Sequence, residues 1–410
     1  MNNTPELLSP AGDLDKMRFG IAYGADAVYM AGTRFGMRAA ATNFDDNALR
    51  EGIAYAHAHG VKCYITVNIM PSNRDLPALP AYLELLQDAG ADALIIADVG
   101  VLRMARRYAP KVPVHISTQT SILNHEAANY WADEGAERIV LARELSLEEI
   151  AKIRAKTPKE LEIEAFVHGA MCISYSGRCL ISQYMTGRDA NHGACAQPCR
   201  WNYSLMEEKR PGQFFPVEED GRGTYLYNSK DMCMIEHVPE LIEAGITSFK
   251  IEGRNKTAYY AACVTGAYRA AIDTYKKDPE NFVLPQFCRD EVNKVSHREY
   301  YTGFYFGNQE NGQHYGDSQY IREYEVVGMP VECDDSGKAV FALKNRFFDG
   351  EELELIQPGQ APYVFRAENV TDDEGTKREL FNVPQMRVHF AFPFKVSEWA
   401  ILRKVKERPE

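Results

Sequence analysis

The 410-residue sequence lacks any apolar run that approaches the roughly 20 residues of a membrane-spanning helix. Its start, MNNTPELLSPAGD, also lacks the basic segment and apolar core of a secretory signal. We therefore expect a cytoplasmic protein with no membrane partner. Positive charge is scarce as well, because 46 Lys and Arg residues face 58 Asp and Glu residues, for a formal net charge of −12. A nucleic-acid footprint over the whole surface is thereby excluded, whereas a local basic groove is not.

Cysteine occurs in an odd number, nine, and five of these residues fall between positions 172 and 233. Without a secretory signal, a disulfide-bonded scaffold is not expected. Clustered cysteines in a reducing compartment more often bind a metal or carry out redox chemistry. The isolated cysteines are expected to be small buried apolar residues; they are Cys63, Cys263, Cys288 and Cys333.

One pattern recurs along the first part of the chain: a helical segment, a glycine and then a short apolar strand. It is clearest in AYGADAVYMAG (22–32), DAGADALIIAD (88–98), DEGAERIVLAR (133–143) and EAGITSFKIEG (243–253). Glycine ends each helix because the left-handed backbone there costs it nothing. Further strands are expected at ELLSP (6–10) and within 61–68, 112–118 and 161–169, so eight strands alternate with helices. This alternation predicts an α/β fold, a (β/α)8 barrel of the TIM type over residues 1–275, with an open doubly wound sheet as the alternative.

The pattern is interrupted once, by a cysteine-bearing insertion after the seventh strand, within residues 168–233. Active sites of such barrels lie at the carboxyl ends of the strands, so we expect the insertion at the active-site face. Beyond the barrel, Pro279 and Pro285 mark a connector over 276–320. Short alternating segments, separated by turns such as DDSGK and FDGEE, then predict a small antiparallel β-barrel over 321–410.

The spacing of four cysteines in the insertion bears on the kind of site they form. Gaps of six, fifteen and three residues separate Cys172, Cys179, Cys195 and Cys199. Structural zinc sites commonly pair ligands about two to four residues apart, which only the last two cysteines approach. Wider spacings on irregular loops suit an iron–sulfur cluster. The spacing favours a cluster and leaves zinc, or buried and redox-active thiols, as alternatives; Cys233 is a fifth candidate.

Polar residues that directly follow the predicted strands would face the barrel mouth. The catalytic candidates are His168, Asp98 and Glu252, and the substrate-binding candidates are Arg34, Arg38, Asn68, Gln119, Arg143 and Arg254. Converging arginines suit an anionic substrate, because the guanidinium fork binds carboxylate or phosphate through two hydrogen bonds. Other interpretations stay open: Asp98 can be a helix N-cap, His168 a structural histidine, and Arg254 a partner of Glu252.

The insertion and both ends of the barrel resemble a known family. The runs EAFVHGAMCISYSGRCLIS and GACAQPCRW are similar to the cysteine signature of the collagenase-like peptidase family, peptidase family U32. The runs PELLSPAGDLDKMRFGIAYGADAVY and SFKIEGRNKTAYY resemble the start and the end of its barrel, so the similarity covers essentially the whole chain. Within the family, the sequence is most similar to the prephenate-dependent tRNA hydroxylases, which form 5-hydroxyuridine at the wobble position.

The resemblance implies an oxygen-independent tRNA hydroxylase with a 4Fe–4S cluster. It assigns the cluster to Cys172, Cys179, Cys195 and Cys199, with Cys233 as an alternative fourth ligand because some relatives use that position. Prephenate, a dicarboxylate, is the implied co-substrate and the tRNA anticodon loop the implied partner; some members also work as pairs of paralogous subunits. Relatives that hydroxylate rRNA or a quinone precursor define the alternative substrates.

Peptidase activity is the remaining alternative, and the sequence gives it little support. Proteolysis needs a nucleophile with a base, or a water activated by a metal. The sequence has no HExxH motif, no GxSxG motif and no obvious pair of aspartates. A cysteine that is bound to a cluster cannot also serve as a free nucleophile.

Overall fold

The computed structural model describes residues 4–37, 42–172, 174–201, 229–307 and 320–406. Between 202 and 228 it describes only the backbone of four short strands, which are β8 (Leu205–Met206), β9 (Phe214–Phe215), β10 (Glu219–Asp220) and β11 (Gly223–Thr224). These strands pair as β8 with β9 and as β10 with β11. In the described ranges, no helix is long and apolar enough to cross a membrane.

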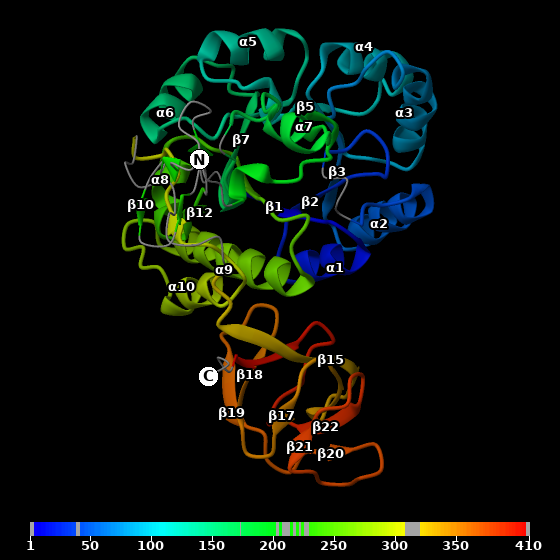
Figure 1. Cartoon of the computed structure of the whole chain (residues 1–410), viewed down its shortest axis with the longest axis vertical. Coiled ribbons are helices and arrows are strands. Elements are labelled where there is room, and N and C mark those ends of the chain that lie inside the picture. The colour runs from blue at the N-terminus through cyan, green and yellow to red at the C-terminus, as the bar shows by residue number, and fades with distance from the viewer. Residues whose placement is uncertain are drawn as a thin grey trace.

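Eight parallel strands form a closed barrel, which confirms the predicted fold class (Figure 1). In chain order they are β1 (Glu6–Pro10), β2 (Ala27–Met30), β3 (Lys62–Val67), β4 (Ala93–Ile96), β5 (Val114–Ile116), β6 (Arg138–Val140), β7 (Glu162–Ala170) and β13 (Ser248–Ile251). Each strand pairs with the next, and β13 pairs with both β1 and β7 to close the ring. The strand residues are almost all buried, as strands covered by helices require.

Helices surround the barrel and connect successive strands (Figure 1). They are α1 (Leu14–Ala22), α2 (Asp46–Ala58), α3 (Leu79–Asp88), α4 (Val99–Tyr108), α5 (His125–Asp133), α6 (Leu147–Ala155), α8 (Val238–Glu243) and α9 (Ala258–Lys277), with the 3₁₀ turns η1 (Leu76–Ala78), η2 (Thr118–Thr120) and η5 (Ile235–His237). Several begin at a side chain that accepts a hydrogen bond from the first turn, as at Asn124 and Ser146. Glycines with positive φ follow helix ends as predicted, among them Gly24 (98°) and Gly245 (86°).

A buried ion cluster around Arg138 fills the amino-terminal end of the barrel interior, which we call the barrel floor. The Arg138 side chain is 2% exposed, and its Nη1 donates to Glu6 Oε1 (2.6 Å) and Glu164 Oε2 (3.0 Å). Arg138 Nε donates to Glu162 Oε2 (2.7 Å), and the Tyr64 hydroxyl donates to the second oxygen of Glu6 (2.6 Å). Burial raises the pKa of Glu6, but the stronger combined effect of Arg138 and other partners lowers it below its usual range.

After β7 the chain leaves the barrel pattern and builds the cysteine-bearing insertion, as predicted. Its described helical elements are α7 (Ile181–Thr186), η3 (Ala190–His192) and η4 (Pro198–Arg200). The strand β12 (Asp231–Cys233) then runs antiparallel to the end of β7, and β14 (Tyr300–Tyr301) pairs parallel to β12. In Figure 1, α7 lies inside the ring of helices, over the strands.

The segment predicted as a connector, 276–320, contains regular structure of its own, namely α10 (Gln286–Asn293) and β14. α10 packs on α9. The Tyr305 hydroxyl donates to the Phe166 carbonyl (2.6 Å), and the Tyr300 hydroxyl to the Val292 carbonyl (2.7 Å). The Tyr305 bond therefore ties the connector to the barrel strand β7, whereas the Tyr300 bond lies within the connector.

The C-terminal domain is an antiparallel sheet of seven strands that forms a half-barrel (Figure 1). The strands are β15 (Tyr324–Cys333), β16 (Lys338–Leu343), β18 (Glu352–Ile356), β19 (Tyr363–Arg366), β20 (Thr371–Asp372), β22 (Arg387–Ala391) and β23 (Ile401–Val405), and β17 (Phe347–Phe348) pairs separately with β21 (Leu380–Phe381). The antiparallel architecture agrees with the prediction, and a separate apolar core rich in phenylalanine supports it.

A second buried ion cluster, which we call the interdomain clamp, joins this half-barrel to the barrel. It consists of Arg403 on β23, Glu354 on β18, and Glu291 and Lys294 at the end of α10. Arg403, whose side chain is 0% exposed, donates to Glu291 Oε2 (2.7 Å) and, through Nε, to Glu354 Oε2 (2.8 Å). Lys294 Nζ lies 2.9 Å from Glu354 Oε2. Separating the domains would leave buried charges uncompensated, so the clamp fixes their relative position.

Candidate active site

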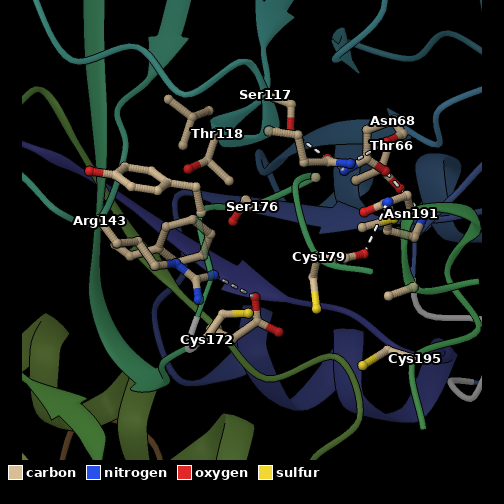
Figure 2. Close-up of a pocket in the computed structure, with 18 of the residues that line it drawn as sticks. Thr66, Asn68, Ser117, Thr118, Arg143, Cys172, Ser176, Cys179, Asn191 and Cys195 are labelled. Atoms are coloured by element: carbon tan, nitrogen blue, oxygen red, sulfur yellow. Dashed lines mark hydrogen bonds and ion pairs between the residues drawn. The ribbon is translucent and has the colours of Figure 1, made fainter. Parts of the chain in front are cut away.

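A cavity lies at the carboxyl ends of the barrel strands, beneath the insertion, and is called the mouth cavity below (Figure 2). It encloses about 1000 Å³, part of which is open to solvent. Its polar lining from the barrel includes Thr66, Asn68, Ser117, Thr118, Gln119, Arg143, Lys250, Glu252 and Arg254. Its polar lining from the insertion includes Cys172, Ser176, Cys179, Asn191, Cys195 and Cys199.

Four of the five candidate cysteines line the mouth cavity: Cys172, Cys179, Cys195 and Cys199. In Figure 2 the sulfur atoms of Cys172, Cys179 and Cys195 project into the same space. The fifth candidate, Cys233, lies on β12 and does not belong to the lining of this cavity. Burial raises the pKa of the Cys233 thiol to about 12, which keeps it protonated in the absence of a metal.

A single metal ion and a polynuclear cluster place different demands on the donors around the mouth cavity. In the described part of the chain, no three His, Cys, Asp or Glu side chains are grouped closely enough to hold one metal ion. A cubane cluster makes a different demand, because each iron binds its own cysteine and the sulfurs stand further apart. Four thiols that border one cavity meet this demand in number and in kind.

Close packing and a hydrogen bond fix the loop that carries the first two cysteines. Asn191 Nδ2 donates to the carbonyl of Cys179 (3.2 Å). Gly177 has a φ of 74°, and a Cβ at this position would come within 2.9 Å of Met70 Cε. The positive φ favours glycine at this turn, because a residue with a Cβ would be strained there.

On the barrel side, two amides that the sequence places at strand ends form one wall. Asn68 follows β3 and Gln119 lies in η2 after β5; Asn68 Nδ2 donates to Gln119 Oε1 (2.6 Å). Gln119 Nε2 donates to the Asn68 carbonyl (2.6 Å), and Ser117 Oγ donates to Gln119 Oε1 (2.8 Å). These mutual bonds hold the amide wall in one orientation, which suits recognition of a flat ligand with hydrogen-bonding edges.

Opposite charges meet where Arg143, after β6, approaches Glu252, after β13. Arg143 Nη1 donates to the Ala170 carbonyl (3.0 Å), and Nη2 lies 3.4 Å from Glu252 Oε2. The guanidinium stands 3.8 Å from the centre of the Phe166 ring. Its buried Nε has no hydrogen-bond partner among the described residues. Arg143 is thus a buried cation, 8% exposed, with donor capacity left over beside the cavity.

Two further cations border the cavity. Arg254 is 3% exposed, and its Nη2 donates to the Met37 carbonyl. Lys250 is 4% exposed; its Nζ lies 2.6 Å from Glu164 Oε1 and 4.5 Å from the centre of the Tyr29 ring. Burial lowers the pKa of Lys250, although Glu164 opposes the shift. Together with Arg143, these residues bring three cations to the lining of the mouth cavity.

Sequence reasoning missed Lys250 because it lies within a strand and not after one. The two-residue period of a strand was the available signal: in SFKIEG it places Lys250 on the same face as Glu252, which does line the cavity.

His168 was predicted as catalytic from its place at the end of β7, but the structure places it outside the cavity. Register shifts between β7 and β13: Lys250 pairs with Phe166, and Ile251 with His168. The irregularity turns His168 away from the barrel interior, towards the rings of Tyr260, Tyr268 and Tyr300. Burial, helped by nearby His297 and Lys256, lowers the pKa of His168 to about 3, so the imidazole is neutral. The structural alternative that we left open for His168 describes its surroundings.

Two other candidates have partners away from the cavity, and a third, Arg38, falls outside the described residues. Asp98 is the N-cap of α4 and accepts a hydrogen bond from the Val101 amide (3.0 Å). Arg34 Nη2 donates to both carboxylate oxygens of Asp46 in the first turn of α2 (2.8 and 2.9 Å). Asn68, Gln119, Arg143, Glu252 and Arg254 are the candidates that the structure brings together.

Comparison with known proteins gives a family and several relatives. Peptidase family U32 matches residues 12–315, and the C-terminal domain of the same family matches residues 322–403. The tRNA hydroxylation protein P1 of Bacillus subtilis (strain 168) is 38% identical over 404 residues, which are 98% of this chain and 95% of the relative. The tRNA hydroxylation protein P of Escherichia coli (strain K12) is 37% identical over 419 residues, 90% of either chain.

One relative acts on a different RNA. The 23S rRNA 5-hydroxycytidine C2501 synthase of Escherichia coli (strain K12) is 40% identical over 332 residues, which are 80% of this chain and 48% of the relative. The family matches together cover nearly all of the barrel and the half-barrel, and the cysteines of the mouth cavity lie within them. The chain therefore belongs to peptidase family U32.

Proposed function

We propose that this protein hydroxylates RNA, and more narrowly that it forms 5-hydroxyuridine at the wobble position of tRNA without molecular oxygen. The observation that carries the proposal is the convergence of four cysteines, three buried cations and an amide wall on one cavity at the barrel mouth. Relatives that span nearly the whole chain are named for tRNA hydroxylation, and another is named for 5-hydroxycytidine synthesis on 23S rRNA.

A 4Fe–4S cluster on Cys172, Cys179, Cys195 and Cys199 is the second part of the proposal. These four thiols border the mouth cavity, whereas Cys233 does not, so we prefer Cys199 over Cys233 as the fourth ligand. When bound, such a cluster supplies one-electron chemistry beside the substrate. The remaining tasks, which are binding, orientation and charge stabilisation, fall to the barrel residues.

The target base would enter the mouth cavity and lie against the amide wall. A base in the anticodon loop is stacked, so its reacting carbon becomes accessible only when the base leaves the stack. Asn68, Ser117 and Gln119 bring amide and hydroxyl groups to one side of the cavity, where they match the donors and acceptors of a uracil edge. The rigid hydrogen bonds between them would favour one orientation of the base.

Prephenate, a dicarboxylate, is the proposed co-substrate, and the buried cations are its proposed binding groups. Arg143, Arg254 and Lys250 all border the mouth cavity. Hydrogen bonds from a guanidinium to a carboxylate are strong when water is excluded. Glu252 lies 3.4 Å from Arg143 and would hold the guanidinium in place before the ligand arrives.

Nucleoside mass spectrometry of tRNA tests the proposal. A strain without this gene should lose 5-hydroxyuridine and its derivatives, and the wild-type gene should restore them. A gene encoding Cys179→Ser should not, because the cluster would lose a ligand. Cys333→Ser is the matched control, since Cys333 is a half-buried cysteine of the C-terminal domain, far along the chain from the site.

The same variants test the cofactor. Protein purified without oxygen should contain about four irons and four sulfides per chain in the wild type and in Cys333→Ser, and less in Cys179→Ser. The purified wild type should hydroxylate tRNA only when prephenate is added. Zinc in place of iron, together with unchanged 5-hydroxyuridine in the deletion strain, would overturn the proposal.

Hydroxylation of rRNA is the second candidate, because the 23S rRNA enzyme is 40% identical over 80% of this chain. A deletion strain with normal tRNA nucleosides and less hydroxylated rRNA would favour it. Peptidase chemistry by a cysteine–histidine pair gains no support from the mouth cavity, whose described lining contains no histidine.

A further inference from the structure

A cleft separates the barrel from the C-terminal half-barrel and leads to the cysteines. It encloses about 2420 Å³, part of it open to solvent, and we call it the interdomain cleft. Gly253 and residues 255–260 line it on the barrel side, and residues from β15 and its surroundings line it on the other. Arg143, Cys172, Cys195, Cys199 and Glu252 line both the cleft and the mouth cavity. Anything that lies in the cleft therefore reaches the proposed reaction site.

The charge of this cleft differs from that of the chain as a whole. Five cations and two carboxylates line it, in a chain with a formal net charge of −12. The carboxylate Glu252 faces Arg143, and Glu325 lies 3.9 Å from Lys404 Nζ. Positive charge in excess of the carboxylates is therefore available to an anionic ligand.

Two of the cations, Lys344 and Lys406, form the exposed rim of the cleft and have no ion-pair partner among the described residues. Their positions are fixed by the backbone, since the Lys344 amide donates to the Val327 carbonyl (2.8 Å) and the Lys406 amide to the Glu323 carbonyl (2.7 Å). Flexible ammonium groups on a fixed backbone suit phosphates whose exact place varies.

The ring of Tyr320, which lines the cleft, has three cations around it. Lys256 Nζ lies 4.4 Å, the Arg298 guanidinium 4.7 Å and the Arg322 guanidinium 5.6 Å from the centre of the Tyr320 ring. Cation–π attraction offsets part of the repulsion between these like charges. Lys256 and Arg322 line the cleft beside this ring, whereas Arg298 is buried outside the lining. Asp231 lies 3.9 Å from both Lys256 and Arg298 and offsets part of their charge.

We propose that the interdomain cleft holds a single-stranded segment of RNA, with its phosphates along Lys344, Lys406 and Arg322 and its target base directed into the mouth cavity. This inference rests on the proposed function, because the substrate there is RNA. A continuous run of phosphates is the ligand that uses rim cations and wall cations together, whereas a small dicarboxylate needs only the buried cations of the mouth cavity.

The double variant Lys344→Glu/Lys406→Glu tests the cleft through binding alone. Its matched control is Lys111→Glu/Lys159→Glu, which makes the same change in net charge at two exposed lysines. These precede β5 and β7, at the opposite end of the barrel. Fluorescence anisotropy with anaerobically purified full-length protein would measure the affinity for a labelled anticodon stem-loop at several salt concentrations.

We expect the cleft variant to bind the stem-loop at least about tenfold more weakly, with a salt dependence reduced by about two phosphate contacts. The control variant should stay within about twofold of the wild type. If the two variants bind the stem-loop with equal affinity, whether or not that affinity is below the wild-type value, the cleft proposal is wrong. The proposed function would still stand in that case, provided that the wild type binds RNA.

Two further outcomes are informative. If the cleft variant loses affinity for a polyglutamate peptide but keeps its affinity for the stem-loop, the cleft recognises an acidic protein and the RNA proposal is wrong. If the wild type binds no RNA and the deletion strain keeps its hydroxylated nucleosides, the proposed function fails together with the cleft. Circular dichroism of both variants would show that each remains folded.

Discussion

The two ends of the barrel interior use the same residue types in opposite ways. At the barrel floor, Arg138 donates to three carboxylates, and Tyr64 occupies the free oxygen of Glu6. At the mouth, Arg143 has one carboxylate near it, Glu252 at 3.4 Å, and its Nε has no partner among the described residues. The floor neutralises its charges internally, whereas the mouth keeps hydrogen-bonding capacity in reserve.

The difference teaches that a buried arginine does not by itself mark an active site. Strand β13 passes through both environments, since Ser248 Oγ lies 3.2 Å from Arg138 at the floor and Glu252 faces Arg143 at the mouth. Between them, Lys250 pairs with Glu164 and still borders the cavity. The degree to which the hydrogen-bonding groups are satisfied separates the stabilising end from the end that can bind a ligand.

Mutation of the barrel floor should give the largest loss in the free energy of unfolding. Arg138→Met leaves Glu6 buried without its arginine and leaves Glu164 with Lys250 as its only cation, so the free energy of unfolding should fall by about 3–5 kcal/mol. Urea denaturation monitored by circular dichroism measures it. Arg106→Met is the control, because the exposed pair of Arg106 with Glu134 should contribute less than about 1 kcal/mol. A loss at Arg138 no larger than that at Arg106 would contradict the saturated floor.

The mouth should respond in substrate binding as well as in stability. Arg143→Gln removes a hydrogen bond and a cation, so the KM for the proposed co-substrate prephenate should rise at least about tenfold while kcat changes less. The free energy of unfolding should fall by only about 2 kcal/mol, because Arg143 pairs with one carboxylate whereas Arg138 pairs with three. Steady-state hydroxylation assays and urea denaturation measure the two effects. An unchanged KM would remove Arg143 from the binding site.

His168 extends the comparison to a buried group outside both ends. Its pKa of about 3 in the folded protein lies below that of an unfolded histidine, so the unfolded chain takes up the proton first as the pH falls. Stability from this residue is therefore complete above about pH 6.5 and is lost progressively towards pH 3, by about 1.4 kcal/mol per pH unit. His168→Phe should lose about 2 kcal/mol less stability than the wild type between pH 6.5 and pH 4.5.

Hydroxylation by His168→Phe separates the structural from the catalytic role. Tyr300 keeps its bond to the Val292 carbonyl in this variant, so the local fold should persist. We expect kcat within about threefold of the wild type at pH 7.5, where the histidine is neutral in either state. A loss of kcat in a variant of wild-type stability would restore the prediction that His168 is catalytic.

Asp98 should give the smallest effect. Asp98→Ala removes the N-cap of α4 and should lower the free energy of unfolding by about 1 kcal/mol. Asp98→Asn keeps the cap and should retain almost all of the stability. Hydroxylation should be unchanged in both variants, and a fall in the Asp98→Asn protein would return Asp98 to the catalytic candidates.

The sequence predicted the barrel well because local signals repeat around it. Glycines such as Gly24 and Gly245 end helices, and apolar strands follow at each repeat. The same regularity predicted part of the site: Asn68 and Gln119, or Arg143 and Glu252, are distant in sequence but follow strands of one ring. Closure of the barrel then brings them within hydrogen-bonding or ion-pairing distance.

Where the arrangement differs from the expected one, the causes are local contacts that a pattern of residue types does not contain. His168 turns outwards because the register between β7 and β13 shifts just before it. Arg34 is held by Asp46, a partner supplied by the first turn of the following helix. The interdomain clamp pairs Arg403 with Glu291, 112 positions away, so only the packed domains reveal it.

The interdomain clamp bears on whether the protein or its ligand changes shape on binding. The buried ion pairs of the clamp join the barrel to the half-barrel, so moving the two domains apart to admit a bulky ligand would cost a large amount of free energy. For the RNA ligand that we propose, any change of shape needed for entry would then occur in flexible loops of the RNA. A rigid cleft of this kind would favour flexible single-stranded RNA over rigid duplexes at the binding step, before the reaction.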